Sequence, residues 1–332
     1  MRRLLISFSG GETSAYMTWW ILNKLAKDYG EIAIVFANTG QENEETLVFV
    51  DQCDRLLFAP LGHRVTWIEG VQIHGERKAA SFRIVDFETA SRDGAPFEDA
   101  IRKYGIPNQK RPGCTRDLKL YPIQAYAKSL GWAREYDTAI GIRGDEIDRM
   151  SGDADKNRII YPLAVERMHM RTKPQINSWW ATQAFRLQLK GYQGNCKWCW
   201  KKSFRKHVTL IDERPEIYDF PARMEREYGL IGAEFRKPDR LVVEGYRRTF
   251  FRGNAAVEDL FEMHHTRGPD FLPAEDDAIV YDMEWDMGGG CGDSESCEVF
   301  SDEYLGADDE EVDLVVPLVI EHRPMLFYAV SV

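Results

Sequence analysis

Short apolar runs alternate with amphipathic segments at the start of the chain. Residues 3–8 (RLLISF) are mostly apolar and end at a Ser-Gly-Gly turn, which predicts a buried strand followed by a loop. Two further β-rich runs occupy residues 31–37 and 63–68, and helix-spaced apolar positions fill the intervals between the runs. This strand–helix–strand–helix–strand order predicts an α/β fold with a parallel sheet that is covered by helices on both faces.

The pattern is less regular in the rest of the chain. It weakens between residues 70 and 113, and we interpret this part as an insertion. The other predicted elements are helices near residues 96–104, 118–130, 176–189 and 215–228, a strand at 136–142 and an extended piece at 159–163. Because the character of the chain changes from Pro174, we expect an α/β domain over residues 1–173 and a mainly helical and loop region over residues 174–332.

Composition and charge limit the classes of function. The 332 residues are 44% hydrophobic, enough for a sizeable core, and none of the apolar runs is long enough to cross a bilayer. The N-terminus lacks the small-residue cleavage site of a signal peptide, so we expect a cytoplasmic protein without a membrane partner. The formal net charge of −11 argues against a general polyanion binder, although residues 298–313 carry much of the acid.

A basic and aromatic run, residues 197–207 (KWCWKKSFRKH), stands against this acidic background. Tryptophans mixed with lysines and arginines are found where single strands of nucleic acid are bound, so a local nucleic acid contact stays open. The interpretation that we prefer is an amphipathic segment that packs its aromatic side chains inward while its lysines face water.

A glycine-rich loop between a predicted strand and a predicted helix is the strongest chemical signal. It consists of Ser9, Gly10, Gly11, Glu12, Thr13 and Ser14. Glycines let the main chain come close to a phosphate, and successive N–H groups at a helix N-terminus attract an anion. The loop differs from the G-x-x-x-x-G-K-[ST] type because no lysine follows. It predicts a nucleotide site, with a plain turn capped by Thr13 or Ser14 as the alternative.

Several motifs occur in the order known from one family. The S-G-G-x-T-S loop resembles the PP-loop of the N-type ATP pyrophosphatases, and most nearly that of the phosphoadenosine phosphosulfate reductase family. Residues 37–40 (ANTG), 114–119 (CTRDLK) and 141–146 (GIRGDE) resemble later motifs of that family, and residues 194–199 resemble its phage-borne members. The resemblance implies a Rossmann-like core of the adenine nucleotide alpha hydrolase (HUP) type with a cysteine-containing C-terminal extension. For a phage-borne gene it implies the cytoplasm of the bacterial host.

The resemblance also implies where an adenine nucleotide lies. The phosphates of ATP, or of phosphoadenosine phosphosulfate, would bind to the glycine-rich loop. In a fold of this kind the carboxyl ends of the strands converge on one crevice, which brings other turns to the same ligand. The residues of these turns implied to bind the nucleotide are Asn38, Thr39 and Gly40, near the adenine, together with Gly141 and Arg143.

Charged residues complete the implied site. Arg116, Lys119 and Arg143 would neutralise phosphate or sulfate oxygens, and the guanidinium of an arginine can bind such oxygens with two parallel hydrogen bonds. Asp145 or Glu146 would hold Mg²⁺ together with phosphate oxygens. We therefore expect Arg116, Lys119, Arg143 and Asp145 to serve in catalysis. The alternative for each is a solvated loop position or a surface ion pair.

Six cysteines in a chain without an export signal predict reduced thiols. Cys196 and Cys199 form a C-x-x-C pair whose spacing lets two thiolates reach one metal, and Cys291 and Cys297 lie in a glycine-rich segment. Four thiolates predict a [4Fe–4S] cluster, with a structural zinc site as the alternative. Cys114 could instead join the pair in a three-cysteine cluster that leaves one iron open. Buried thiols without metal are the remaining alternative.

Three functions fit these motifs. The first is an enzyme that adenylates an acceptor oxygen with ATP, releases pyrophosphate, and could pass sulfur from a donor to nucleic acid or a small molecule. The second is a sulfonucleotide reductase. Its C-terminal E-C-G-x-H segment is missing from the sequence, where Cys291-Gly292-Asp293 is the nearest element and no histidine follows. The third is a nucleotide-binding module without turnover that acts in phage–host conflict.

Overall fold

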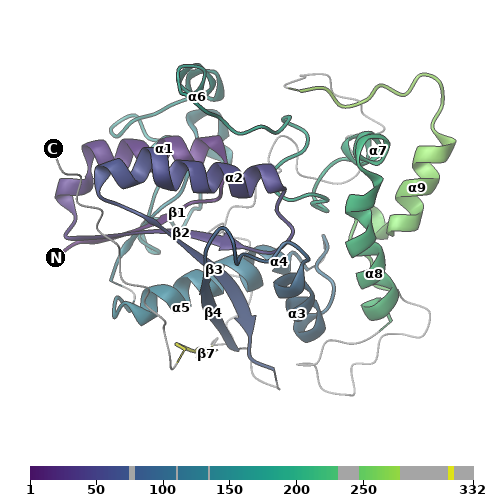
Figure 1. The fold of residues 1–332 in the computed structure, drawn as a ribbon, viewed down its shortest axis with the longest axis horizontal. Helices are drawn as coiled ribbons and strands as arrows, with labels where there is room; N and C mark the ends of the chain where they lie inside the picture. The colour runs from purple at the N-terminus through teal and green to yellow at the C-terminus, as the bar shows by residue number, and fades with distance from the viewer. Residues whose placement is uncertain (75–78, 110, 134, 231–246, 277–312, 318–332) are drawn as a thin grey trace.

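A seven-stranded sheet forms the centre of the computed structural model, which describes residues 1–74, 79–109, 111–133, 135–230, 247–276 and 313–317 (Figure 1). The strands are β1 Arg3–Ser7, β2 Glu31–Asn38, β3 Val65–Gln72, β4 Ala79–Val85, β5 Asp137–Ala139, β6 Ile159–Ile160 and β7 Asp313–Leu314. Their order is β6-β5-β1-β2-β3-β4-β7, and the pairs from β6 to β3 are all parallel. The predicted α/β class with a mostly parallel, Rossmann-like sheet is therefore confirmed.

Strand β4 departs from the predicted pattern. It lies in the part of the chain that we interpreted as an insertion, and it pairs antiparallel with β3 from Trp67↔Val85 to Gln72↔Ala80. Its sequence, A-A-S-F-R-I-V, has no regular alternation of apolar and polar residues. Strand propensity depends strongly on the partner strand, so a short run of this kind gives little local signal. The sheet is consequently mixed at the β4 end.

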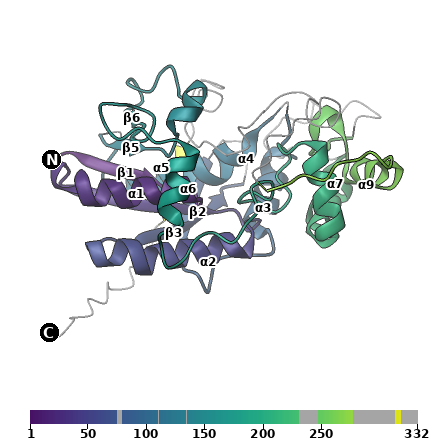
Figure 2. The ribbon, with the colours of Figure 1, turned by 90° about the horizontal axis from the view of Figure 1, so that it is seen from above.

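Helices cover both faces of the sheet, as Figures 1 and 2 show. The α-helices are α1 Glu12–Lys24, α2 Glu44–Gln52, α3 Ala95–Tyr104, α4 Gly113–Thr115, α5 Tyr121–Ser129, α6 Lys173–Trp180, α7 Phe204–Glu213, α8 Asp219–Tyr228 and α9 Val257–Thr266. Shorter 3-10 or π turns are η1 Ala26–Asp28, η2 Cys53–Phe58, η3 Ala59–Leu61, η4 Arg116–Leu120, η5 Gly144–Arg149, η6 Pro215–Tyr218 and η7 Arg252–Asn254. Successive β1 side chains alternate between two apolar clusters, with Leu4 and Ile6 facing α1, α2 and α6, and Leu5 facing α5.

A third apolar cluster lies beyond the carboxyl ends of the strands, where Figure 1 shows α7, α8 and α9. It joins Phe97 of α3 to Trp198 and Met224, far along the chain. Conversely, Trp180 of α6, from the C-terminal region, belongs to the apolar cluster that contains Leu4, Ile6 and residues of α1. The apolar clusters thus run across the predicted boundary between residues 1–173 and 174–332, and that division stays a prediction.

The helix predicted over residues 176–189 is shorter than expected. Helix α6 ends at Trp180, and residues 184–190 have no regular secondary structure. The chain after α6 is held by tertiary contacts instead, since Phe185 packs on Trp180 and Arg186 forms an ion pair with Glu12. The prediction was wrong there because such contacts override local helix propensity.

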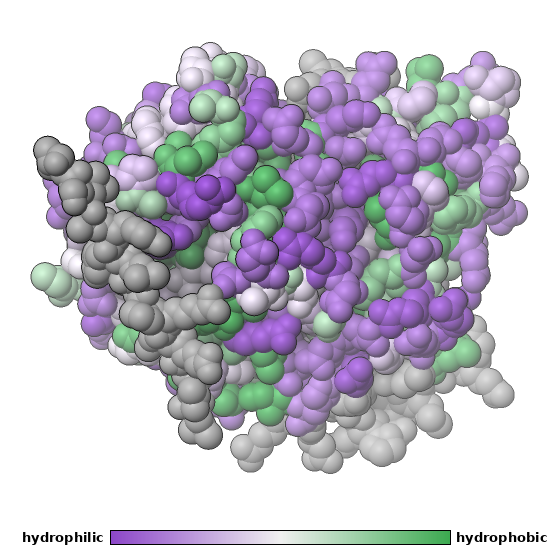
Figure 3. Space-filling view, viewed as in Figure 1, coloured by the Kyte–Doolittle hydropathy of each residue, from purple (hydrophilic) through white to green (hydrophobic). Residues whose placement is uncertain are grey.

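The outer surface is largely polar. Figure 3 shows a face on which hydrophilic residues predominate and apolar residues form separate small patches. Within the part of the chain that the structure describes, no helix is long and apolar enough to cross a membrane.

Candidate nucleotide site

The loop between β1 and α1, residues 9–14, is hereafter called the glycine loop. Gly10 has a left-handed φ of +80°, and Gly11 is the extended residue immediately before α1. The hydroxyls of Ser9 and Ser14 lie 3.0 Å apart, and Ser14 Oγ also donates to Gly11 O at 3.0 Å. Among the described residues, the N–H groups of Gly10, Gly11, Glu12 and Thr13 have no protein acceptor. Such successive N–H groups at a helix N-terminus form a cradle for an anion.

The two glycines of the loop are needed for different reasons. A Cβ built on Gly10 would lie 2.8 Å from Thr46 Cγ2, closer than real Cβ atoms come, so the fold itself demands glycine there. A Cβ on Gly11 would meet its nearest atom, Asn195 Nδ2, at an ordinary 3.6 Å. The fold therefore tolerates a side chain at Gly11, and its absence leaves the main chain accessible on that side.

Glu12 contributes to the loop through its main chain. Its carboxylate is turned to Arg186, with 3.0 Å between Nε and Oε1, and its carbonyl oxygen accepts a hydrogen bond from Trp180 Nε1 at 3.0 Å. These contacts come from α6 and the segment after it. What Glu12 offers to an anion is consequently its N–H group, while its side chain fixes the start of α1.

The residues after β5 lie against the glycine loop. A Cβ on Gly141 would be 3.1 Å from Ser14 Cα, so the two main chains are in close contact. Arg143 Nη1 donates to Thr13 Oγ1 at 3.3 Å, and the Arg143 side chain is 16% exposed. The structure therefore brings Gly141 and Arg143 to the loop, with the guanidinium of Arg143 at Thr13.

The two acidic candidates for Mg²⁺ are paired with arginines. Asp145 Oδ1 lies 3.0 Å from Arg143 Nε and also accepts from the Lys173 N–H at 3.2 Å, and Glu146 Oε2 lies 3.2 Å from Arg143 Nη1. Burial opposes ionisation of Asp145, but the hydrogen bond and charge of Arg143 outweigh it and hold the pKa of this carboxyl below its usual value. A divalent cation at Asp145 would have to compete with Arg143 for the same oxygens.

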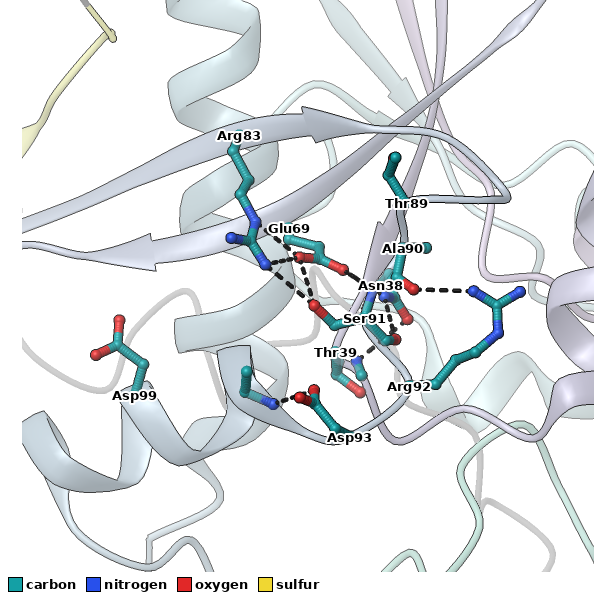
Figure 4. Close-up of polar contacts among 12 residues, drawn as sticks. Asn38, Thr39, Glu69, Arg83, Thr89, Ala90, Ser91, Arg92, Asp93 and Asp99 are labelled. Carbon is teal, nitrogen blue, oxygen red and sulfur yellow. Dashed lines mark hydrogen bonds and ion pairs between the residues drawn. The ribbon is translucent and has the colours of Figure 1, made fainter.

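The turn at residues 38–40 is buried and held by its own side chains (Figure 4). Asn38 Nδ2 donates to Glu69 Oε1 at 2.6 Å and to Ser91 O at 2.9 Å, while Asn38 Oδ1 accepts from the Gly40 N–H at 3.1 Å. Glu69 is fully buried and also pairs with Arg83, with 2.8 Å from Nε to Oε2. The Asn38 side chain thus fixes the shape of the turn and is fully engaged with protein groups.

The other two residues of this turn are also tightly fitted. Thr39 donates through both its N–H and its hydroxyl to Glu42 Oε2, at 2.9 and 2.8 Å. Gly40 has a φ of +79°, and a Cβ there would lie 3.0 Å from Gly94 Cα. The predicted adenine contact at Asn38, Thr39 and Gly40 stays a prediction, while the side chains of Asn38 and Thr39 hold the turn.

Lys119 reaches this turn, while Arg116 is occupied nearby. Lys119 is buried, and its Nζ lies 3.6 Å from Oε1 of Glu42, the carboxylate that holds Thr39. Arg116 Nε donates to the neighbouring Asp117 at 3.0 Å. Both cations therefore pair with carboxylates, and Cys114 packs against the third apolar cluster.

Residues 194–199, hereafter the cysteine segment, dock onto the same turn from far along the sequence. Cys196 pairs with Glu42 in an antiparallel bridge, and the Lys197 N–H donates to Gln41 O at 2.9 Å. Trp198 Nε1 donates to Gln41 Oε1 at 2.5 Å. Cys196 thus lies at the turn that follows β2, a contact for which the sequence has no local signal.

The sequence did not predict a role at this site for Asn195, Asn43 or Glu42. Asn195 Nδ2 donates to Ser9 O at 2.9 Å, and the Asn195 carbonyl accepts from the Asn43 N–H at 2.8 Å. Glu42 links the 38–40 turn to Lys119. Asn195 stands directly before Cys196, but nothing in the local pattern indicates its partner in the glycine loop.

Only some of the cysteines predicted to bind a metal belong to the part of the chain that the structure describes. Cys291 and Cys297 lie outside the described residues. Within the described ranges, no group of three or more His, Cys, Asp or Glu side chains is arranged to hold a metal ion. A metal on Cys196 and Cys199 would therefore need further ligands from residues that the structure does not describe, and the cluster stays a prediction.

The basic and aromatic run, residues 197–207, is more buried than expected. Trp198 and Trp200 are buried, as expected, but Lys201 and Lys202 are 6% and 1% exposed and Arg205 is 7% exposed. Lys202 Nζ donates to Cys196 O at 2.8 Å. The expectation that the lysines face water was wrong for Lys201 and Lys202, which pack inside the protein, whereas Lys197 and Lys206 are partly exposed. Buried rings of this kind cannot stack on nucleic acid bases.

Comparison with known proteins identifies a relative encoded by a phage. No model of a known protein family matches the chain. The chain is 30% identical over 300 residues to the uncharacterized nin region protein ORF290 of Escherichia phage lambda, and the alignment covers 89% of this chain and 94% of the phage protein. Similarity at this level over almost the full length of both proteins supports a shared fold. The chain belongs to the family of the phage lambda nin region protein ORF290.

Proposed function

We propose that this protein is a PP-loop enzyme that binds ATP at the glycine loop and transfers its adenylyl group to an acceptor with release of pyrophosphate. The observation that carries the proposal is the row of N–H groups at Gly10, Gly11, Glu12 and Thr13, which have no acceptor in the described part of the chain. Arg143 adds a guanidinium at Thr13. The site sits at the carboxyl ends of parallel strands, where open α/β sheets bind ligands.

The proposed reaction needs no nucleophile from the protein. An acceptor oxygen attacks the α-phosphorus of ATP, the bond between the α-phosphorus and the bridging oxygen breaks, and pyrophosphate leaves with that oxygen. The glycine loop would hold the leaving phosphates, and Arg143 would neutralise the charge that develops on them. A nitrogen or sulfur nucleophile could then displace AMP from the adenylated acceptor. Mg²⁺ on the phosphates would supply further charge neutralisation, with Asp145 as a candidate ligand.

The position of the cysteine segment favours sulfur chemistry as an extension of this reaction. Cys196 follows Asn195, which touches Ser9 of the glycine loop, so a thiol and the proposed phosphate site share one region of the molecule. A cluster or zinc held by Cys196 and Cys199 would bring a sulfur donor or a structural metal to the nucleotide. The HUP-type fold and the kinship with phosphoadenosine phosphosulfate reductases are parts of the same proposal.

The test incubates the full chain, prepared without oxygen, with MgATP and with pools of small-molecule or nucleic acid acceptors. Formation of AMP and pyrophosphate, lost in a folded Gly11→Val protein, would support the proposal. Sulfite release from phosphoadenosine phosphosulfate with a thiol reductant would instead identify a sulfonucleotide reductase. ATP binding without product in every pool would identify a non-catalytic module, and absence of any nucleotide binding would overturn the proposal.

A further inference from the structure

We infer that Asn195 sets the orientation of the Ser9–Gly10 peptide and thereby keeps the glycine loop ready for an anion. Asn195 is a positioning residue in this inference, which rests on the proposed function for the identity of its ligand. The contact that suggests it is the 2.9 Å hydrogen bond from Asn195 Nδ2 to Ser9 O. It joins the cysteine segment to the glycine loop across 186 positions of sequence.

The geometry of the peptide bond turns this contact into an orientation. In a planar trans peptide the C=O and the N–H point in opposite directions. Asn195 holds the Ser9 oxygen, so the N–H of Gly10 in the same peptide must point away from Asn195. A peptide turned by half a rotation would present the Ser9 oxygen in place of the N–H, and a carbonyl oxygen repels an anion.

Glycine makes this peptide easy to turn without such a contact. Gly10 has a φ of +80°, and glycine populates conformations on both sides of φ zero at little cost. The Thr46 side chain packs under Gly10 and restricts its Cα, but it makes no hydrogen bond to the Ser9 oxygen. The Asn195 amide is therefore the group that selects one orientation of the peptide.

Asn195 is itself held in place, as a positioning residue must be. Its carbonyl oxygen accepts from the Asn43 N–H at 2.8 Å, and the preceding Gly194 carbonyl accepts from Asn43 Nδ2 at 2.8 Å. Lys202 Nζ then binds the following carbonyl, that of Cys196, at 2.8 Å. The carbonyl groups of residues 194–196 are thus all hydrogen-bonded. Two of these bonds come from Asn43 at the start of α2, so the main chain that carries the Asn195 side chain is fixed.

The amide is also the right chemical group for this position. It donates to an oxygen and carries no charge. A carboxylate at the same place could not donate to Ser9 O and would bring a negative charge within reach of Gly11, where a bound phosphate is expected. Asn195→Asp should for this reason weaken anion binding more than Asn195→Ala does, although it is closer in shape.

One labelling experiment reads the peptide directly. The sequence contains two Ser–Gly peptides, Ser9–Gly10 and Ser151–Gly152, so cell-free protein made with ¹³C-carbonyl serine and ¹⁵N-glycine gives two carbonyl–amide correlations. Without ligand, the Ser9–Gly10 signal should be single in the native protein and doubled or exchange-broadened in Asn195→Ala. The Ser151–Gly152 signal should stay in place and reports a folded chain. An unchanged Ser9–Gly10 signal in Asn195→Ala would overturn the inference.

Calorimetry with inorganic pyrophosphate and with MgATP adds the functional readout. We expect Asn195→Ala to bind about tenfold more weakly, as loss of one positioning hydrogen bond implies, and Asn195→Asp to bind more weakly still. Gln193→Ala is the matched control, because Gln193 Oε1 accepts from the Lys190 N–H within its own segment. Equal affinities in all variants would count against Asn195. If the native protein bound neither ligand, the proposed function would fail while the peptide signal still decided the positioning role.

Discussion

Gly141 lies against Ser14 so closely that a Cβ on Gly141 would come within 3.1 Å of the Ser14 Cα. Gly141 follows β5 and Ser14 is in the first turn of α1, so the contact joins the ends of two neighbouring strands. Arg143, two residues on, then reaches Thr13. Arg143 can place its guanidinium at the glycine loop because Gly141 has no side chain to separate the two segments.

Gly141→Ala should move the loop and the Arg143 guanidinium apart. The added methyl group has to displace main-chain atoms of α1, and overpacking of this kind costs about 1–3 kcal/mol of stability. We expect a lower thermal midpoint together with a loss of pyrophosphate affinity of about tenfold or more, as one misplaced charged hydrogen bond implies. Calorimetry and thermal unfolding measure both. Gly268→Ala is the control, since nothing lies within 4 Å of a Cβ there and Gly268 does not have a left-handed φ.

Gly11 offers a cleaner test of the anion cradle than Gly10. A Cβ on Gly11 meets protein atoms only at 3.6 Å or beyond, whereas a Cβ on Gly10 would clash with Thr46 at 2.8 Å. We expect Gly11→Val to abolish measurable ATP binding in a protein that stays folded, because its side chain would stand between the N–H groups and a phosphate. Gly10→Val should instead unfold or destabilise the chain. Native affinity for ATP in folded Gly11→Val protein would contradict this assignment.

Arg143→Ala should discriminate between parts of the nucleotide. The guanidinium lies at Thr13, beside the N–H groups expected to hold the phosphates. Its loss should weaken ATP and pyrophosphate binding by about ten- to a hundredfold, the range for a charge-assisted hydrogen bond, and leave adenosine binding nearly unchanged. Titration calorimetry with the three ligands measures the difference. Equal losses for ATP and adenosine would show that Arg143 acts through the fold or on the base.

The features that could be predicted from the sequence are those with local signals. Strands β1 and β2 are mostly apolar, and the glycine loop is recognised from six adjacent residues between a strand and a helix. The association of Gly141 and Arg143 with that loop followed from the convergence of strand ends in a parallel sheet. The structure brings these residues together as expected.

The features that could not be predicted depend on distant partners. Asn195 meets Ser9, and Trp198 meets Gln41 across 157 positions, through single side-chain contacts without any periodic pattern. Lys201 and Lys202 have the charge of surface residues, yet they lie buried because the cysteine segment folds back onto the 38–40 turn. Charge alone did not indicate this, since burial of a lysine is decided by the partners that tertiary structure supplies.

The metal prediction can be tested by counting. Cys196→Ser and Cys199→Ser should each lower the iron or zinc content of anaerobically purified protein, because each removes one thiolate of the proposed site. A closed four-thiolate site requires Cys291 and leaves Cys114 dispensable, and an open-iron cluster requires the reverse. Elemental analysis and the ultraviolet–visible spectrum of the single serine variants separate these cases. A native protein with neither metal, and with the thiols of Cys196 and Cys199 titratable while folded, would contradict both versions.

His169 should make the protein lose stability as the pH falls. Its ring stacks on Trp20 with 4.6 Å between centroids, and its Nε2 lies 2.8 Å from the Tyr16 hydroxyl, which can donate to a neutral imidazole. Burial, helped by the positive charges of Arg171 and Lys24, lowers the pKa of His169 from 6.5 to about 4. Between these two values the unfolded chain takes up a proton that the folded protein refuses, so His169 contributes stability above pH 6.5 that is lost progressively toward pH 4.

His169→Phe isolates this effect from the other titrating groups. Phenylalanine keeps a ring on Trp20 but cannot bind the Tyr16 hydroxyl or take up a proton. The variant should therefore be less stable than the native protein at neutral pH, and residue 169 should add no pH dependence to its stability. Thermal midpoints measured from pH 7 to pH 4.5 should therefore converge as the pH falls, because the native protein loses the contribution of His169 and the variant has none to lose. Parallel curves for the two proteins would mean that the imidazole titrates in the folded state as it does in the unfolded chain, and that neither burial nor the stack on Trp20 holds it neutral.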